Sequence, residues 1–364
     1  MKPTRFALIT AASFAVSTRA HTVLSRLFVD GVSQGDGTCI RMPNDAGTAT
    51  YPVEDINNND MACGVNGENP VNFTCPVSAG GRLTFEFRAW PDASQIGSIE
   101  EGHKGPCAVY AKQVDSMSED SATGPGWFKL WEEGYDSTTK QWCIDKLRES
   151  NGLLTIKIPE GLPSGYWLFR PELLALHDVP TTGPQFFTQC AQVFVDGNSS
   201  VPLDVPAEKL VSIPGYLAKD DPGLTFNIYE STSPYPIPGP EVFEVPVVVA
   251  GAIHDEASPP QQTEGVIPSN YIVKNGNWVG FEVSSYTDEK GCDAAFSDCE
   301  IQVASCYDNT QPTGNIGCRA METRCSIVQD TCGDGKSTGP PDGGKKLQVK
   351  EPAPPGEIPD PVNV

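Results

Sequence analysis

The sequence is poor in positive charge and in long hydrophobic runs. Of its 364 residues, 25 are lysine or arginine and 47 are aspartate or glutamate, so the formal net charge is −22. A chain this acidic is repelled by nucleic acid and by anionic membranes, and neither is expected as a partner. The apolar run from Phe6 to Val16 is too short to cross a membrane. These shortages predict a globular protein whose ligand is uncharged.

The first twenty residues, MKPTRFALITAASFAVSTRA, have the layout of a secretory signal peptide. A basic start is followed by a short apolar run and by the small residue Ala20. Cleavage there would make His21 the first residue of a secreted, extracellular protein. An N-terminal histidine offers its α-amine and its imidazole Nδ1, and such nitrogens suit copper. Taken alone, this position is explained more simply as an accident of cleavage.

Helical periodicity is also scarce, whereas glycine and proline are plentiful, with 35 and 33 residues. Short strand-like segments alternate with turns, and the polar stretch 43–59 reads as a surface loop. The predicted strands are 22–32, 82–90, 107–111, 127–131, 152–159, 165–176 and 185–195. This pattern predicts an all-β fold, an immunoglobulin-like antiparallel β-sandwich with long loops. Within it, Leu83, Phe85 and Phe87 alternate and are expected on one face.

The twelve cysteines form two groups of six. The first group is Cys39, Cys63, Cys75, Cys107, Cys143 and Cys190, and the second is Cys292, Cys299, Cys306, Cys318, Cys325 and Cys332. In a secreted chain they predict disulfides within each group, but six cysteines allow 15 pairings. The sequons at Asn72 and Asn198 are candidate N-glycosylation sites on surface turns.

Composition divides the chain into five segments. We predict a signal peptide (1–20), a β-sandwich domain (21–250), a linker (251–267), a small disulfide-rich, partly helical module (268–335) and a disordered Pro/Gly-rich tail (336–364). The module has one tryptophan, Trp278, and few other aromatic residues, so a spacer or protein-contact role is as plausible as carbohydrate binding.

Histidine is rare, with four in the chain: His21, His103, His177 and His254. His103 lies in a Gly-His-Lys-Gly-Pro turn that can hold its ring on a rigid loop. Together with His21 it would complete a T-shaped set of three copper-binding nitrogens. His177 follows an apolar strand and is interpreted as structural, with its ring hydrogen-bonded at the strand end. His254 lies in the predicted linker and is assigned no role.

Several motifs occur in the order found in one family. They are His21, Asp60-Met-Ala-Cys63, Gly102-His-Lys-Gly-Pro106, Trp127-Phe-Lys129, Ile158-Pro159, Ala175-Leu-His177, Gln185-Phe186, Cys190-Ala-Gln192 and Ile237-Pro-Gly-Pro240. From about residue 21 to 243 the chain resembles the fungal lytic polysaccharide monooxygenases of auxiliary activity family nine. The Cys-rich module more weakly resembles a C-terminal extension found on some of these enzymes.

The resemblance implies a copper enzyme. His21 and His103 would bind one copper ion, Gln185 would hydrogen-bond near its oxygen site, and Cys63 would pair with Cys190. Such enzymes are secreted monomers that take electrons from an external donor. With hydrogen peroxide or dioxygen they oxidise C1 or C4 of a β-1,4-linked glucan such as cellulose.

Two positions depart from the family pattern. Phe187 stands where an axial tyrosine is usual, and Arg170-Pro171-Glu172 replaces Arg-His-Glu. The phenyl ring of Phe187 would still block the axial face. Pro171 removes a proton donor, a loss that typically costs about two to four orders of magnitude in rate, although Gln185 could supply part of the missing hydrogen bond.

Substrate contact is predicted at Tyr235, because exposed aromatic rings stack on sugars; packing on the long loop is an even alternative. The function predicted first is copper-dependent oxidative cleavage of a polysaccharide. Phe187 and Pro171 motivate an alternative, a copper-binding protein of the same fold with little or no monooxygenase activity, acting in copper handling or at the fungal cell surface. A hydrolytic glycosidase with paired carboxylates is a third alternative, which composition does not test.

Overall fold

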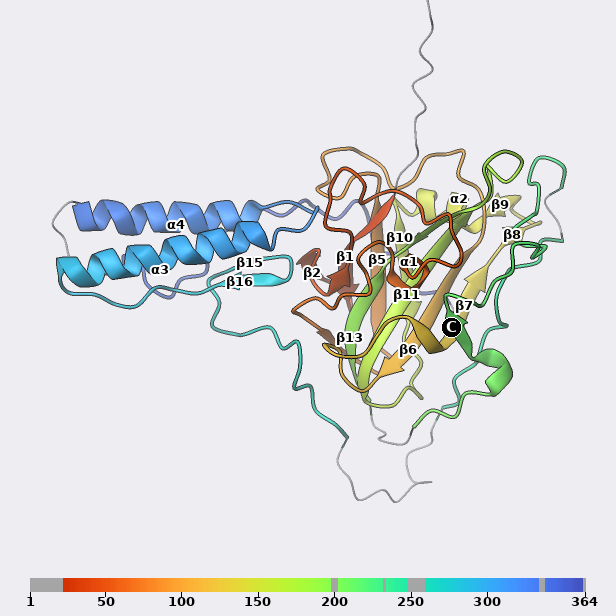
Figure 1. The fold of residues 1–364 in the computed structure, drawn as a ribbon, viewed down its shortest axis with the longest axis horizontal. Coiled ribbons are helices and arrows are strands. Elements are labelled where there is room, and N and C mark those ends of the chain that lie inside the picture. The colour runs from red at the N-terminus through yellow and green to blue at the C-terminus, as the bar shows by residue number, and fades with distance from the viewer. Residues whose placement is uncertain (1–21, 198–201, 232–233, 248–258, 334–337, 363–364) are drawn as a thin grey trace, which may run out of the picture.

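Two β-sheets packed face to face form the main body of the protein, and a helical hairpin projects from one side (Figure 1). The computed structural model describes residues 22–197, 202–231, 234–247, 259–333 and 338–362. The four-stranded sheet contains, in spatial order, β10 (Leu153–Lys157), β5 (Arg82–Arg88), β1 (Val23–Val29) and β2 (Val32–Asp36). The eight-stranded sheet contains β14 (Val211–Ile213), β7 (Gly124–Glu133), β6 (Cys107–Val114), β11 (Gly165–Ala175), β13 (Cys190–Asp196) and β3 (Ile40–Arg41), with β12 (Gln185–Thr188) on β11 and β4 (Cys75–Ser78) on β13.

Every strand pair in the two sheets is antiparallel except β4–β13. The shorter elements lie in the connections: α1 (Asp60–Cys63), β8 (Tyr135–Asp136), β9 (Gln141–Trp142), α2 (Cys143–Glu149) and the 3-10 turn η1 (Ala207–Lys209). The predicted all-β sandwich is therefore confirmed.

The long strand predicted over 185–195 is in fact two strands. β12 and β13 pair with the two ends of β11 in one common register, with Glu172 opposite Thr188 and Phe169 opposite Ala191. The ladder is interrupted at Gln189, whose side-chain oxygen accepts a hydrogen bond from the Leu24 backbone N–H at 2.9 Å. This bond ties the first strand of the domain to the segment just after β12.

The alternation predicted in β5 is confirmed, because Leu83, Phe85 and Phe87 all point into the core between the sheets. The opposite face of β5 is buried as well. There, Glu86 and Arg88 form an ion pair, and Arg88 also pairs with Asp36. The alternating pattern of β5 predicts that the face with Glu86 and Arg88 is exposed to solvent, but in the structure this face is covered.

The C-terminal tail provides part of that cover, although its composition predicts disorder. The Pro352 carbonyl accepts a hydrogen bond from the buried Arg26 at 2.9 Å. Val362 forms a parallel bridge with Ile156, and its N–H donates to the Thr155 carbonyl at 2.8 Å. The tail thereby supplies partners to β10, the edge strand of the four-stranded sheet, which would otherwise expose unpaired backbone groups.

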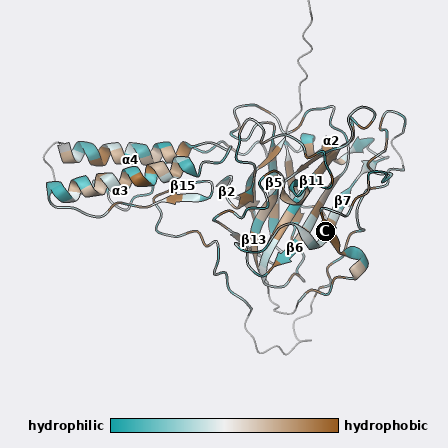
Figure 2. Cartoon of the chain, in the orientation of Figure 1, coloured by the Kyte–Doolittle hydropathy of each residue, from teal (hydrophilic) through white to brown (hydrophobic). Residues whose placement is uncertain are grey.

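The C-terminal module is a helical hairpin packed on a two-stranded ribbon. It contains β15 (Val273–Asn275), β16 (Trp278–Gly280), α3 (Glu289–Asp308) and α4 (Ile316–Gly333). On each helix the cysteines recur every seven residues, which places them on one face. Three disulfides join the helices, Cys292–Cys332, Cys299–Cys325 and Cys306–Cys318. Short helices and turns were expected, but the disulfides join two long helices. Hydrophilic and hydrophobic residues are mixed along both helices (Figure 2).

The module is docked on the sandwich through polar contacts. The buried side chain of Asn277 accepts a hydrogen bond from the Cys39 N–H at 2.9 Å and donates to the Gly37 carbonyl at 2.8 Å. The described part of the predicted linker also contacts the sandwich, because Gln262 donates to the Thr74 carbonyl at 2.8 Å. None of the helices in the described ranges combines the length and apolar character needed to cross a lipid bilayer.

Replacing Asn277 should weaken this docking. Asn277→Ala would leave the buried Cys39 N–H and Gly37 carbonyl without these partners, and each such loss costs about 1–3 kcal/mol. We expect the free energy of unfolding to fall by about 2–4 kcal/mol in chemical denaturation. Asn270→Ala is the control, since Asn270 is an exposed asparagine of the same module. Equal stability of the two variants would contradict this role for Asn277.

Candidate metal centre

His103 is held by a loop that is clamped to the end of β11. The His103 N–H donates to the Glu100 carbonyl at 3.1 Å, and the Lys104 carbonyl accepts from the Leu176 N–H at 2.9 Å. At Gly105 a β-carbon would lie 1.9 Å from the Leu174 carbonyl oxygen, so only glycine permits this close approach. The loop therefore presents a buried, rigidly placed imidazole.

The neighbour of His103 is His177. Their ring centroids lie 3.8 Å apart at an interplanar angle of 41°. Burial lowers the pKa of His177 below its ordinary value, against the opposing effect of the carboxylates of Asp178 and Glu100, so its ring is neutral near pH 7. Its buried Nδ1 has no hydrogen-bond partner within the ranges described above. The sequence assigned His177 a structural role, but the structure brings its ring into contact with the predicted copper ligand.

Asp178 joins His177 to Gln185. Its Oδ2 lies 3.2 Å from His177 Nε2 and accepts a hydrogen bond from Gln185 Nε2 at 3.2 Å. The three side chains therefore form one polar group beside His103. Sequence reasoning did not single out Asp178; its place directly after the Ala-Leu-His motif was the available signal.

Phe187 also lies near His103. It is 1 % exposed, and its ring centroid lies 6.1 Å from that of His103. The loop 43–59 pairs with the same strand, because Val53 and Phe186 exchange backbone hydrogen bonds of 2.8 and 3.1 Å. The predicted blocking position of Phe187, close to the ligand imidazole, is consistent with this geometry.

Arg170 and Pro171, from the motif that departs from the family's Arg-His-Glu, lie within the sheet. Arg170 is buried, pairs with Glu172 at 2.6 Å and donates to the Met61 carbonyl at 2.9 Å. Pro171 lies in the middle of β11, and its carbonyl accepts from Thr188 Oγ1 at 3.0 Å. The loss of a proton donor at Pro171 stays a prediction, while the structure places another histidine, His177, against His103.

Tyr235 packs on the long loop. From the sequence, this packing and substrate contact were equal alternatives. Its hydroxyl donates to the Gly223 carbonyl at 3.0 Å. Its ring meets Trp142 and Phe226 edge-on, with both centroid distances at 5.0 Å. A substrate-stacking role for Tyr235 stays a prediction.

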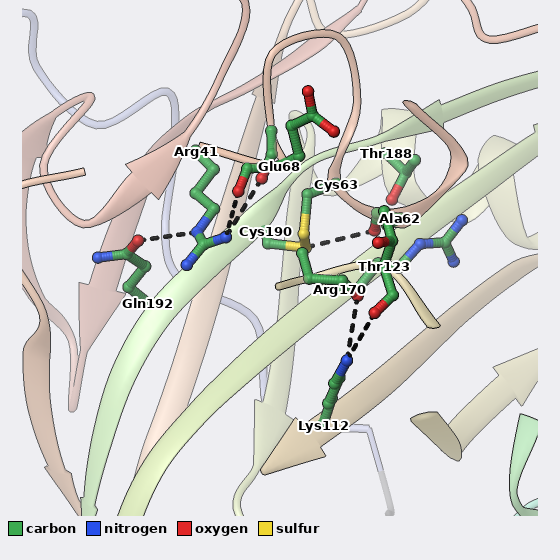
Figure 3. Close-up of a disulfide and its surroundings, with 12 residues drawn as sticks. Arg41, Ala62, Cys63, Glu68, Lys112, Thr123, Arg170, Thr188, Cys190 and Gln192 are labelled. Atoms are coloured by element: carbon green, nitrogen blue, oxygen red, sulfur yellow. Dashed lines mark hydrogen bonds between the residues drawn. A yellow bond between two sulfur atoms is a disulfide. The ribbon is translucent and has the colours of Figure 1, made fainter. Parts of the chain in front are cut away.

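A disulfide braces the same region, joining Cys63 at the end of α1 to Cys190 at the start of β13 (Figure 3). The other disulfides of the sandwich are Cys39–Cys75 and Cys107–Cys143, so every pairing stays within its own group as predicted. Figure 3 also places the buried Arg41 near this bridge, donating to Gln192. Burial lowers the pKa of Arg41 to about 10, so its guanidinium stays charged near pH 7.

Some predicted positions lie outside the described residues. They are the signal peptide 1–20, His21, Asn198 and His254. Among the described residues, no group of three or more His, Cys, Asp or Glu side chains could hold a metal ion. A copper site built on His103 therefore depends on a ligand from elsewhere, as the pairing with His21 requires.

Comparison with known proteins identifies the class. Residues 21–235 match the family model of Auxiliary Activity family 9, formerly GH61. The chain is 45 % identical over 337 residues to an AA9 family lytic polysaccharide monooxygenase C of Aspergillus tamarii, covering 90 % of this chain and 89 % of that protein. It is 46 % identical over 332 residues to monooxygenase H of Botryotinia fuckeliana, covering 88 % and 75 %. Both matches extend well beyond the family model into the C-terminal part.

Solved structures agree with this result. CvAA9A shares 34 % identity and a TM-score of 0.54, covering 61 % of this chain and 98 % of its own. A cellulose-active polysaccharide monooxygenase from M. thermophila shares 28 % identity and a TM-score of 0.51, covering 61 % and 99 %. The chain belongs to Auxiliary Activity family 9, and it is a lytic polysaccharide monooxygenase, an oxidative enzyme of a copper-dependent, secreted family.

Proposed function

We propose that His21 and His103 bind one copper ion and that the enzyme oxidatively cleaves a β-1,4-linked glucan. The observation that carries this proposal is the polar group around His103, with the His177 ring centroid 3.8 Å away. The strand that follows His21 in the sequence is anchored to the same region, since the Leu24 N–H donates to Gln189. Cleavage of residues 1–20 would free the amine of His21 for the metal.

The side chains present fit copper. Imidazole nitrogen is a suitable copper ligand, and His103 is fixed by the loop clamped to β11. When bound, the metal supplies the one-electron chemistry with which dioxygen or hydrogen peroxide, together with an external reductant, oxidises a sugar C–H bond. The apolar ring of Phe187 keeps water from one side of the site, which favours a controlled reaction.

His177 and Gln185 supply the hydrogen bonding around the reacting oxygen. The neutral imidazole of His177 can donate from one nitrogen and accept at the other. Asp178 contacts both side chains and so restricts their rotation. These residues supply hydrogen-bonding groups that Pro171 lacks, and this favours an active monooxygenase over a copper-binding protein without activity.

A cleft next to this group suits the sugar chain. Its volume is about 580 Å³, and its lining includes Glu54, Asp55, Val179, Pro184 and Lys219. Gly183 and Pro184 directly precede Gln185, and Val179 directly follows Asp178, so two walls of the cleft continue into the segments that carry the proposed oxygen-site residues. Its combination of apolar side chains with a few hydrogen-bonding and charged groups is typical of ligand-binding clefts.

Product analysis tests the proposal. Protein processed to His21 and loaded with copper should be given ascorbate and low peroxide over cellulose, xyloglucan and mannan. Mass spectrometry should then detect C1- or C4-oxidised oligosaccharides, which disappear when copper is removed with a chelator. Absence of oxidised products from protein that holds one copper would favour the copper-binding alternative. Unoxidised products formed without copper would favour a glycosidase.

Asp178 should matter for rate more than for folding. Asp178→Asn keeps the size of the side chain but removes the charge that holds His177 and Gln185. We expect oxidised-product formation to fall by about 10–100-fold, the usual loss when a residue that orients metal-site groups is removed. Copper affinity should change less than activity, as measured by titration calorimetry. Asp220→Asn, at an exposed aspartate of another loop, is the control, and equal activity of the two variants would refute this role.

A further inference from the structure

A polar groove lies where the C-terminal module meets the sandwich. Its volume is about 410 Å³, within the usual range for small-ligand sites. Amide side chains from both parts line it: Asn44, Asn66, Asn69, Asn72, Asn277 and those of the segment 308–311. Amides offer both hydrogen-bond donors and acceptors, the chemistry that recognises sugar hydroxyl and acetamido groups.

Asn72 connects this groove to a modification site. It is the first residue of the sequon Asn72-Phe-Thr74 and it is exposed. Its Nδ2 donates a hydrogen bond to the Asn277 carbonyl at 3.1 Å. A primary amide carries two hydrogens on this nitrogen, and the Asn277 carbonyl uses one of them. The other hydrogen is the one that N-glycosylation can replace without loss of this contact.

We propose that the groove holds the first sugars of an N-glycan attached to Asn72, and that this glycan helps to join the module to the sandwich. In the attachment step, Asn72 Nδ2 forms a bond to C1 of the first sugar. The C1–O bond to the diphosphate of a lipid-linked oligosaccharide donor breaks, and one amide proton is lost. The attached sugar then starts inside a groove whose opposite wall is the module.

The order of synthesis is compatible with this arrangement. Asn277 lies 205 residues after Asn72 in the chain, so a glycan added during synthesis is in place before the module exists. The module then folds against both protein and sugar. Asn44 and Asn69 have exposed side chains at the groove and are free to contact the sugar.

Shielding of the glycan from an amidase tests the proposal. The full chain, secreted from a yeast, is digested under native conditions with a peptide N-glycosidase, and peptide mass spectrometry follows the glycans on Asn72 and Asn198. Removal at Asn72 should be about tenfold faster in Asn44→Ala/Asn69→Ala than in Asn270→Ala, an exposed asparagine outside the groove. The rate at Asn198 should be equal in both proteins. Asn72→Gln, which loses the sequon, should also unfold about 2–4 °C lower.

Three results would overturn the proposal. One is an Asn72 without glycan in the secreted protein. Another is equal removal at Asn72 in the groove variant and in Asn270→Ala. The third is saturable binding of free N,N′-diacetylchitobiose to Asn72→Gln, together with an unmodified Asn72 in the parent chain, which would make the groove a site for a free saccharide.

Discussion

His103→Ala should abolish formation of oxidised oligosaccharides. The imidazole of His103 is the described half of the proposed copper site, and its loop holds that ring in place through backbone hydrogen bonds. Removing residues that merely orient metal ligands lowers metal affinity by about 10–100-fold, so loss of a ligand should exceed about 100-fold. Titration calorimetry should detect this loss directly, and product mass spectrometry should find no copper-dependent signal.

The folded state should survive this substitution. Copper stabilises the native protein by binding to it, so the parent enzyme should melt at higher temperature when copper is added. In His103→Ala that copper-dependent increase should vanish, while the metal-free melting temperature changes little. Lys104→Ala is the matched control, because Lys104 is exposed in the same loop. Tight binding of one copper by His103→Ala, with oxidised products retained, would disprove the assignment.

Removal of the Cys63–Cys190 disulfide should give the largest loss of stability. This bond closes a separation of 127 residues and joins α1 to the start of β13. Loops of this length predict a stabilisation of about 3–5 kcal/mol through restriction of the unfolded chain. We expect Cys63→Ala/Cys190→Ala to melt about 10 °C lower in calorimetry. Copper affinity should also fall, because Cys190 lies just after β12 and Phe187.

The module offers a matched control. Cys306–Cys318 closes a separation of only 12 residues. Loop-closure entropy then predicts a stabilisation smaller by about 2 kcal/mol than that of Cys63–Cys190. Cys306→Ala/Cys318→Ala should therefore leave the sandwich transition and copper affinity nearly unchanged. A larger effect of the short bridge than of the long one would contradict this explanation.

Patterns among residues close together in the sequence were sufficient to predict much of the fold. Alternation in β5 placed Leu83, Phe85 and Phe87 in the core, because successive residues of a strand point to opposite faces. Even cysteine groups predicted disulfides inside each group. The sequence did not predict that residues 338–362 would cover the four-stranded sheet, because their Pro/Gly-rich composition carries no periodic signal.

The candidate site also has features that the sequence predicted and features that only the structure revealed. The turn around His103 and the aromatic residue at Phe187 were evident from local sequence and from the resemblance. The sequence by itself determined the β-sandwich and the family, and with them the resemblance of His21, His103 and Gln185 to the family's copper-site residues. These features depend on local alternation and on motifs in a fixed order. Only the tertiary structure decided that His177 lies against His103 and that Asp178 joins it to Gln185. These contacts depend on the register of β11 against its neighbours and on the clamp at Gly105, which act between residues far apart in the chain.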